Sequence, residues 1–422
     1  NLQGSDLFVS KFKLRSNLLD LDADGGVTLA NLYPGKINAE WRWNESDSGL
    51  FAGSIRVDGD MDQYEVRHSL ASPLSITTQG TINIQPDNIG ADLLSEWNAL
   101  EWPLGEQTVY SSEGKLRIRG NTSAVVVDLG ALAALDENPE SRIELGGDVR
   151  LQPVPFFDLE YNVGNLNPAL VLESVSGQLN LAGRVAGSIT EQGPDVELVV
   201  EQVHGVLNDN AVNGKGEVHL VGNEFSVADA QIAIGPNTVH VDGHIGSSLA
   251  LRAEIDATSI ADVLPQAGGS IVGWASLSGP RHNPDMQLEL QGSALSWQES
   301  SSSLGPVDAT VSIAGKLEAH TMEADIRALD SKVAIALGGG FNGQAWAGTL
   351  ASLSIDNAVY GRWSTIASSD LLASTSTSKV SQTCLHAPDE NGKACFGGQL
   401  GSDGPATFDV ALTGIPLAAL PA

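Results

Sequence analysis

Three side chains at alternate positions, His240, Asp242 and His244, are the chain's most suggestive group of potential metal ligands. Imidazole nitrogens and a carboxylate on one face of a strand can converge on a zinc ion. The same spacing also arises when a strand turns one face to water, and Val239 and Val241 occupy the intervening positions. The solvated strand face is the simpler interpretation, so we predict no metal site here.

A second group of potential ligands is acidic. Asp20, Asp22 and Asp24, followed by Gly25, have the spacing found in the first half of a calcium-binding loop. The twelfth position of such a loop needs a bidentate glutamate, but Asn31 stands there. We therefore expect a solvated acidic turn, with a calcium site as the alternative.

The only two cysteines of the chain are Cys384 and Cys395. The ten residues between them include Pro388 and the turn pair Asn391-Gly392, which favours two flanking strands in register. A disulfide is the expected state, and it would imply an oxidising compartment. Two free thiols remain an alternative, as does zinc, although only His386 stands nearby as a further ligand.

The sequence contains none of the motifs that would indicate a common enzyme class. It has no Gly-x-Ser-x-Gly turn, no His-Glu-x-x-His helix and no phosphate-binding glycine loop. We predict a non-catalytic protein without a cofactor. The formal net charge of −30, from 52 acidic and 22 basic residues, disfavours nucleic acid and anionic membrane surfaces as partners. Any contact with lipid would therefore be apolar.

The elements that position these residues are strands. Apolar and polar residues alternate along most of the chain, and 46 glycines separate the runs. Residues 53–66 align with 114–127 glycine for glycine, and residues 177–200 share their order of strands and turns with 269–290. This pattern predicts an all-β, repetitive sheet of roughly 25 strands. We expect only a few short helices, at 92–102, at Asn167-Pro168 and at Ser259.

Residues 1–422 are expected to form one continuous elongated body. Its repeat-like units are predicted at approximately 50–113, 114–175, 176–267 and 268–360, with a cysteine-containing strand region at 361–422. Because so few helices are available to cover a sheet, the apolar face must either pack against a second sheet or line an open groove for an apolar ligand. Alternation is compatible with both arrangements.

The candidate groove residues are the aliphatic side chains that alternate with polar ones. They are Ile55, Val57, Leu116, Ile118, Leu179, Leu181, Val196, Leu198, Val218, Leu220, Ile232, Ile234, Val239, Val241, Leu249, Leu251, Met286, Leu288, Leu290, Val311, Ile313, Val333 and Ile335. For each residue taken singly, ordinary core packing explains the pattern equally well. The groove hypothesis rests on the whole set.

The order of these segments resembles the TamB family, within the AsmA-like group of proteins. The resemblance is carried by EWPLGEQTVYSSEGKLRIRG (101–120), by GSIVGWASLSGPRHNPDMQLELQGSALSW (269–297) and by the cysteine pair followed by FDVALTGIPLAAL (408–420). It implies a β-taco, an elongated folded-over sheet with an apolar concave groove. It also implies a periplasmic location in a Gram-negative bacterium, in a protein anchored to the inner membrane.

The function implied by the resemblance is outer-membrane biogenesis. The groove would conduct phospholipids, through their acyl chains, between the inner and outer membranes. It would also support outer-membrane protein insertion with a TamA-like barrel protein. The family's anchor helix and C-terminal domain are not recognised here, so we expect a middle portion of a longer chain. The alternative is a secreted β-repeat adhesin or glycan-binding protein, since these are also acidic and rich in glycine.

Overall fold

A computed structural model of the chain describes residues 2–29, 31–45, 49–72, 74–104, 107–135, 140–168, 176–297, 306–387, 392–401 and 406–414. The chain divides into two compact units. Unit 1 comprises residues 1–207 with 217–222, and unit 2 comprises 208–216 with 223–422. Strand β16 (Asn210–Val221) contributes residues to both units. The predicted repeat boundaries remain predictions.

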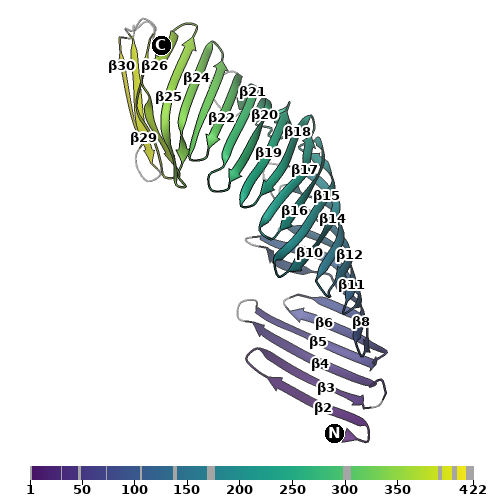
Figure 1. Ribbon diagram of the computed structural model, residues 1–422. Coiled ribbons are helices and arrows are strands. Elements are labelled where there is room, and N and C mark those ends of the chain that lie inside the picture. The colour runs from purple at the N-terminus through teal and green to yellow at the C-terminus, as the bar shows by residue number, and fades with distance from the viewer. Residues whose placement is uncertain are drawn as a thin grey trace. The chain divides into compact units, whose positions relative to one another are not determined.

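Unit 1 is a series of antiparallel strands in which sequence neighbours are usually sheet neighbours (Figure 1). Strand β10 is the exception, because it pairs with β8 and β11 and also with β9. The strands are β1 (Leu2–Gln3), β2 (Asp6–Arg15), β3 (Leu19–Thr28), β4 (Gly35–Glu45), β5 (Gly49–Asp60), β6 (Gln63–Ser72), β7 (Ile76–Gln85), β8 (Asn88–Trp97), β9 (Leu100–Leu104), β10 (Gln107–Asn121), β11 (Ala124–Leu135), β12 (Ser141–Arg150), β13 (Phe156–Leu166), β14 (Gly177–Thr190) and β15 (Gly193–Leu207).

Unit 2 repeats this arrangement. Near its C-terminal end β25 pairs with both β26 and β27, and β28 pairs with all three of β26, β27 and β29. Its further strands are β17 (Glu224–Ile234), β18 (Asn237–Ile245), β19 (Ser248–Ala257), β20 (Ala267–Pro280), β21 (Asp285–Trp297), β22 (Val307–Lys316), β23 (Ala319–Ala328), β24 (Ser331–Phe341), β25 (Ala345–Asn357), β26 (Gly361–Thr365), β27 (Ser369–Ser374), β28 (Thr377–His386), β29 (Lys393–Gly401) and β30 (Thr407–Thr413).

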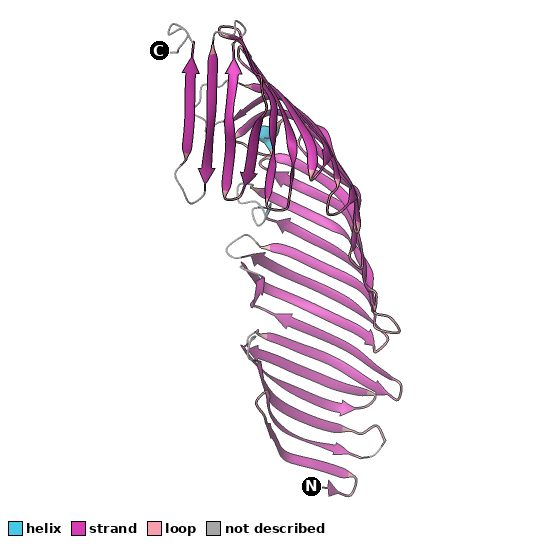
Figure 2. Cartoon of the chain, turned by 60° about the vertical axis from the view of Figure 1, so that its left-hand side comes forward, coloured by secondary structure: helices cyan, strands magenta, loops and turns pink. Residues whose placement is uncertain are grey.

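Nearly all described residues lie in antiparallel strands, as Figure 2 shows. The prediction of an all-β fold built from successive antiparallel strands is therefore confirmed, and the apolar concave groove of a β-taco remains a prediction. Fully buried apolar side chains are few, because strand after strand is added sideways and no thick core forms. The buried apolar residues among those described are Val66, Ala133, Ala186, Leu207, Val212, Ala257, Ala267, Leu350, Leu385 and Cys395.

The helix predicted at 92–102 is wrong. Residues 88–97 form β8, and Leu100–Leu104 form β9. Strand β8 pairs with β7 on one side and β10 on the other, so a helix here would leave two sheet edges without partners. The hydrogen bonds to two strands outweigh the helical spacing of four apolar residues. Leu94 accordingly lies on the polar side, opposite Gln79 and Arg117.

The other two helix predictions have different outcomes. A short 3-10 helix, η2 (Ile260–Asp262), follows Ser259, so the prediction there is confirmed as a single turn. The helix expected at Asn167-Pro168 falls largely on 169–175, outside the described residues.

Aromatic rings crossing over glycines are a repeated local feature of both units. In unit 1, Tyr161 on β13 lies opposite Gly183 on β14, and its hydroxyl donates to the carbonyl of Val199 on β15 at 3.2 Å. A Cβ on Gly183 would lie 2.6 Å from the tyrosine oxygen. The missing side chain is therefore what lets the ring reach the second strand. In unit 2, Trp346 reaches His320 over Gly339 in the same way.

Candidate functional site

The candidate groove residues are brought together on one side of the strands, which we call the apolar face. In unit 1, Val57 lies between Ile37 and Val66 on the neighbouring strands. Ile118 lies between Leu93 and Val127. Because directly opposite residues in an antiparallel pair point to the same side, the aliphatic rows of successive strands join into one surface.

Unit 2 has an apolar face of the same kind. Val239 lies between Ile232 and Ile255, and the Leu288 side chain lies between Ala275 and Ile313. Farther along, Ile335 on β24 lies opposite Ala324 and Leu353. Val218 and Leu220 on β16 are half-buried and alternate with exposed neighbours. The strand pairings thus place the paired candidate residues of unit 2 on one face, and a ligand role for the candidate residues remains a proposal.

The apolar face is partly open to solvent in both units. None of the candidate groove residues is buried. All are half-buried except Ile232, which is 37% exposed. The interior of a two-sheet sandwich is close-packed and excludes water. Side chains along this face are instead reachable from solvent over many consecutive strands.

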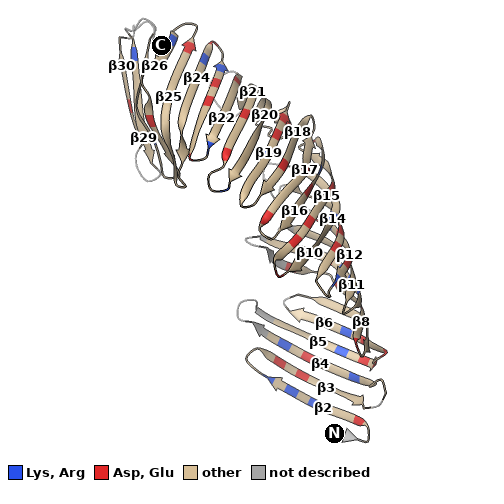
Figure 3. Ribbon diagram, viewed as in Figure 1, with Lys and Arg blue, Asp and Glu red and all other residues tan. Residues whose placement is uncertain are grey.

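Basic and acidic residues recur along the strands of both units (Figure 3). On the face opposite to the apolar one, which we call the polar face, ion pairs join neighbouring strands. Arg117 donates two hydrogen bonds to Asp92, from Nε at 2.9 Å and Nη2 at 2.8 Å. Lys36 lies 2.8 Å from the carboxylate of Asp58. These hydrogen bonds, from Arg117 and Lys36 respectively, hold the pKa of each carboxyl below its ordinary value. The carboxylates therefore stay ionised.

A hollow of about 1440 Å³ lies on the polar face of unit 1, over β7, β8 and β10 to β15. Its charged lining residues include Lys115, Asp128, Glu144, Asp158 and Arg184. Arg184 and Asp158 form a bidentate pair, and the hydrogen bonds from Arg184 lower the pKa of that carboxyl. Part of the charge in this hollow is thus already neutralised within the sheet.

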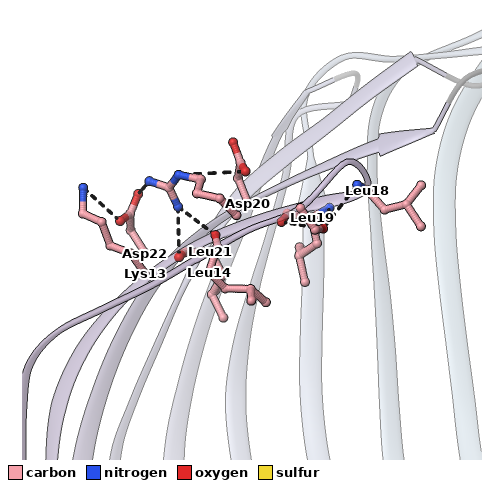
Figure 4. A network of polar contacts seen from close by, with 9 residues as sticks. Lys13, Leu14, Leu18, Leu19, Asp20, Leu21 and Asp22 are labelled. Atoms are coloured by element: carbon pink, nitrogen blue, oxygen red, sulfur yellow. Dashed lines mark hydrogen bonds and ion pairs between the residues drawn. The ribbon is translucent and has the colours of Figure 1, made fainter.

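The acidic run of residues 20–24 is neither a calcium loop nor a turn, so both interpretations of it were wrong. It lies within β3, and Asp22 binds Arg15 and Lys13 of β2. Figure 4 shows Asp20 and Asp22 on the side of the strand opposite to Leu19. Pairing with β2 and β4 holds the segment extended, and the hydrogen bond from Arg15 lowers the pKa of Asp22.

The alternating group on β18 forms part of the polar face, as its simpler interpretation predicted. His240 contacts Asp242, and His244 Nε2 lies 3.9 Å from Glu224. Asp242 also accepts a hydrogen bond from the backbone N–H of Asp229 at 2.8 Å. Among the described residues, no group of three or more His, Cys, Asp or Glu side chains is arranged to hold a metal.

Cys384 and Cys395 lie directly opposite each other on β28 and β29 and are joined by a disulfide in the structure. The cysteine hairpin therefore has the strand register that its turn residues predict. Residues 388–391, which include the Asn391-Gly392 turn's first residue, lie outside the described residues.

Sequence reasoning missed the polar side chains on the apolar face. His68 on β6 shares this face with Val66 and Leu70, and Thr78 and Ser95 lie beside it on β7 and β8. The alternation of side chains could have predicted the position of His68, because it lies two residues from both Val66 and Leu70.

Comparison with known proteins agrees with this architecture. The family model described as the N-terminal domain of TamB matches residues 1–159 and again 143–305. Two overlapping matches are consistent with a fold built by repetition. No helix among the described residues is long and apolar enough to cross a membrane.

A curated relative from Haemophilus influenzae, the translocation and assembly module subunit TamB, is 23% identical over 269 residues. That stretch covers 54% of this chain and 20% of the relative, so the chain corresponds to only a minority of the relative's length. The family model, in contrast, matches well over half of the chain. On the strength of this match and of the repeated antiparallel strands, the chain belongs to the TamB family.

Proposed function

We propose that this chain conducts phospholipids between the inner and outer membranes of a Gram-negative envelope, with their acyl chains against the apolar face. In this proposal the chain is one section of a periplasmic protein that is anchored to the inner membrane. The full-length protein would support outer-membrane protein insertion together with a TamA-like barrel. Family membership and the name of the Haemophilus relative support a role in outer-membrane assembly.

The observation that carries the proposal is the apolar face itself. Its aliphatic rows are in register from strand to strand and half-buried, so an acyl chain can reach them. Each CH₂ group that leaves water contributes about 0.8 kcal/mol. A lipid tail needs no charged protein group to be held, which suits a chain of net charge −30. Movement of a tail along the aliphatic rows exchanges one set of apolar contacts for a similar set.

Native mass spectrometry of the purified chain tests the proposal. We expect co-purifying masses that match phospholipids, and crosslinking of a photoactivatable phospholipid to apolar-face residues in preference to polar-face residues. A chain that carries only glycan or calcium would instead support the adhesin alternative. Crosslinks distributed equally over both faces would reject the assignment of the apolar face.

A further inference from the structure

Three polar side chains form a continuous row across the apolar face of unit 1. His68 on β6 lies opposite Thr78 on β7, and Thr78 lies opposite Ser95 on β8. The hydroxyls of Thr78 and Ser95 are 2.8 Å apart and hydrogen-bonded. The side chains at the two ends of the row are apolar, Ile55 on β5 and Leu116 on β10.

Apolar side chains also border the row along the strand direction. On one side lie Val66 and Leu93, and on the other lie Leu70, Ile76 and Trp97, all on the same face. Polar groups in apolar surroundings cost free energy unless they find hydrogen-bond partners. Within the described part of the chain, the ring nitrogens of His68 have no hydrogen-bond partner. Alternation alone would be satisfied by aliphatic residues at all three positions, so the row needs another explanation.

The ring of His68 is held in place by Trp41. The two rings stack with their centroids 5.8 Å apart and their planes 8° from parallel. Trp41 lies opposite Gly53 on β5, and a Cβ there would come within 2.9 Å of the indole. Gly53 therefore gives the indole the space to lie across β5 and reach His68. The imidazole is thus positioned before a ligand binds.

The row offers neutral hydrogen-bond donors. Burial lowers the pKa of His68, so its imidazole is uncharged at neutral pH and has one N–H to donate. Of the two hydrogen-bonded hydroxyls, one donates to the other, which keeps its own proton available. Such a row is complementary to acceptor oxygens on a molecule whose remaining surface is apolar.

We propose that His68, Thr78 and Ser95 form a polar station that binds the acceptor oxygens of a lipid's glycerol region while its acyl chains lie on the flanking apolar residues. This inference rests on the proposed function. The oxygens belong either to the acyl esters or to the phosphate. The station would interrupt uniform sliding and give a passing lipid a preferred position and orientation on unit 1.

Binding of three probes to the 422-residue chain tests the station. Diphenylhexatriene reports on the apolar face alone, dihexanoyl phosphatidylcholine carries esters and phosphate, and dihexanoylglycerol carries esters only. The variants are His68→Phe, which keeps an aromatic ring to stack on Trp41, Thr78→Val and Ser95→Ala. Thr77→Val is the matched control, because it makes the same chemical change one residue away on the polar face.

We expect each station variant to bind phosphatidylcholine about fivefold more weakly, the effect of one net hydrogen bond, and to bind diphenylhexatriene as the unsubstituted chain does. An equal loss for dihexanoylglycerol would assign the contact to the esters, and no loss would assign it to the phosphate. If the station variants bind phosphatidylcholine like Thr77→Val, the station is rejected while the proposed function stands. If no probe binds the unsubstituted chain, the proposed function fails and the station fails with it.

A measurement on the unsubstituted chain tests the station even if the variants misfold. In the unsubstituted chain, phosphatidylcholine should shift the ¹⁵N signals of the His68 ring, whereas diphenylhexatriene should leave the hydrogen bonding of those nitrogens unchanged. Unchanged ring signals at saturating phosphatidylcholine would overturn the proposal.

Discussion

The indole N–H of Trp346 donates a hydrogen bond to Nε2 of His320 at 2.9 Å, across the intervening strand β24. His320 is only 9% exposed, and its Nδ1 lies 3.0 Å from the carbonyl oxygen of Lys316. Because Nε2 accepts from the indole, the neutral ring carries its proton on Nδ1 and donates it to that carbonyl. One aromatic side chain thus fixes both the orientation and the tautomer of a buried histidine.

We expect Trp346→Phe to destabilise unit 2 by about 1–3 kcal/mol, because it leaves the buried Nε2 of His320 without a donor. Urea unfolding followed by circular dichroism measures the loss. The double variant with His320→Phe should recover part of it, since both polar partners are then replaced by apolar rings. If the double variant loses as much stability as the two single variants added together, the hydrogen bond contributes nothing to the stability of unit 2.

Gly183→Ala should destabilise unit 1 more than an ordinary surface substitution, by about 1–3 kcal/mol. The added Cβ would lie 2.0 Å from the carbonyl oxygen of Val199 and 2.6 Å from the hydroxyl of Tyr161. Either the strand spacing or the tyrosine must shift. Gly338→Ala is the matched control, because a Cβ there meets no atom within 4 Å. Equal unfolding midpoints for the two variants would contradict a steric role for Gly183.

Alternation in the sequence was sufficient to predict an all-β fold and the aliphatic residues of the apolar face, but not the polar row of His68, Thr78 and Ser95 that crosses it. The position of Leu288 on the apolar face, for example, can be predicted from its polar neighbours Gln287 and Glu289, because successive side chains of a strand point to opposite sides. The sequence pattern gives the wrong secondary structure where hydrogen bonds to neighbouring strands determine it. Residues 92–97 carry a helical spacing of apolar residues, yet hydrogen bonds to β7 and β10 make them a strand.

Side-chain contacts between neighbouring strands also escaped prediction. The spacing of Asp20, Asp22 and Asp24 suggested ligands for an ion, but their partners are Arg15 and other side chains of adjacent strands. The stacking of Trp41 on His68 likewise depends on the register that places Gly53 beside the indole. A single sequence gives the period of a strand without its register against the neighbouring strand.

Acidification should destabilise unit 1 through His68. Burial lowers the pKa of this histidine in the folded state below its ordinary value of 6.5. As the pH falls below that value, the unfolded chain binds more protons than the folded chain, so stability falls until the folded-state pKa is also passed. His68→Phe should therefore lose less stability than the unsubstituted chain between about pH 7.5 and pH 5.5. Urea unfolding at each pH measures the stability of both proteins. Equal losses of stability in the two would show that His68 has the same pKa in the folded and unfolded states.

The disulfide between Cys384 and Cys395 should be present in protein purified from an oxidising compartment and should stabilise the β28–β29 hairpin. Intact-mass measurement after alkylation without reductant should show no modified thiol. Closing a loop of this size contributes up to about 3 kcal/mol, chiefly by restricting the unfolded chain. Reduction should therefore lower the unfolding midpoint of unit 2 and leave that of unit 1 unchanged. Two alkylated cysteines in the untreated protein would contradict the bridge.

A charge on the apolar face of unit 2 should impair lipid contact more than folding. In Leu288→Arg the new side chain stands between Ala275 and Ile313, on a face that solvent reaches. A long arginine can bring its guanidinium to water along such a face, so we expect a stability loss of about 1–3 kcal/mol and a folded protein. In a closed core the same charge would be desolvated and would prevent folding.

Gln287→Arg is the control for this prediction. Gln287 precedes Leu288 on β21, is exposed and lies on the polar face opposite Ser276 and Ala314. Glu289 is less suitable, because it accepts a hydrogen bond from the Trp274 indole at 3.2 Å. We expect crosslinking to a photoactivatable phospholipid to fall severalfold in Leu288→Arg and to stay unchanged in Gln287→Arg. The charged guanidinium interrupts the apolar path, because an acyl chain that passes it loses contact with the neighbouring aliphatic side chains. Full crosslinking in a folded Leu288→Arg variant, or complete unfolding of it, would reject an open lipid path at this position.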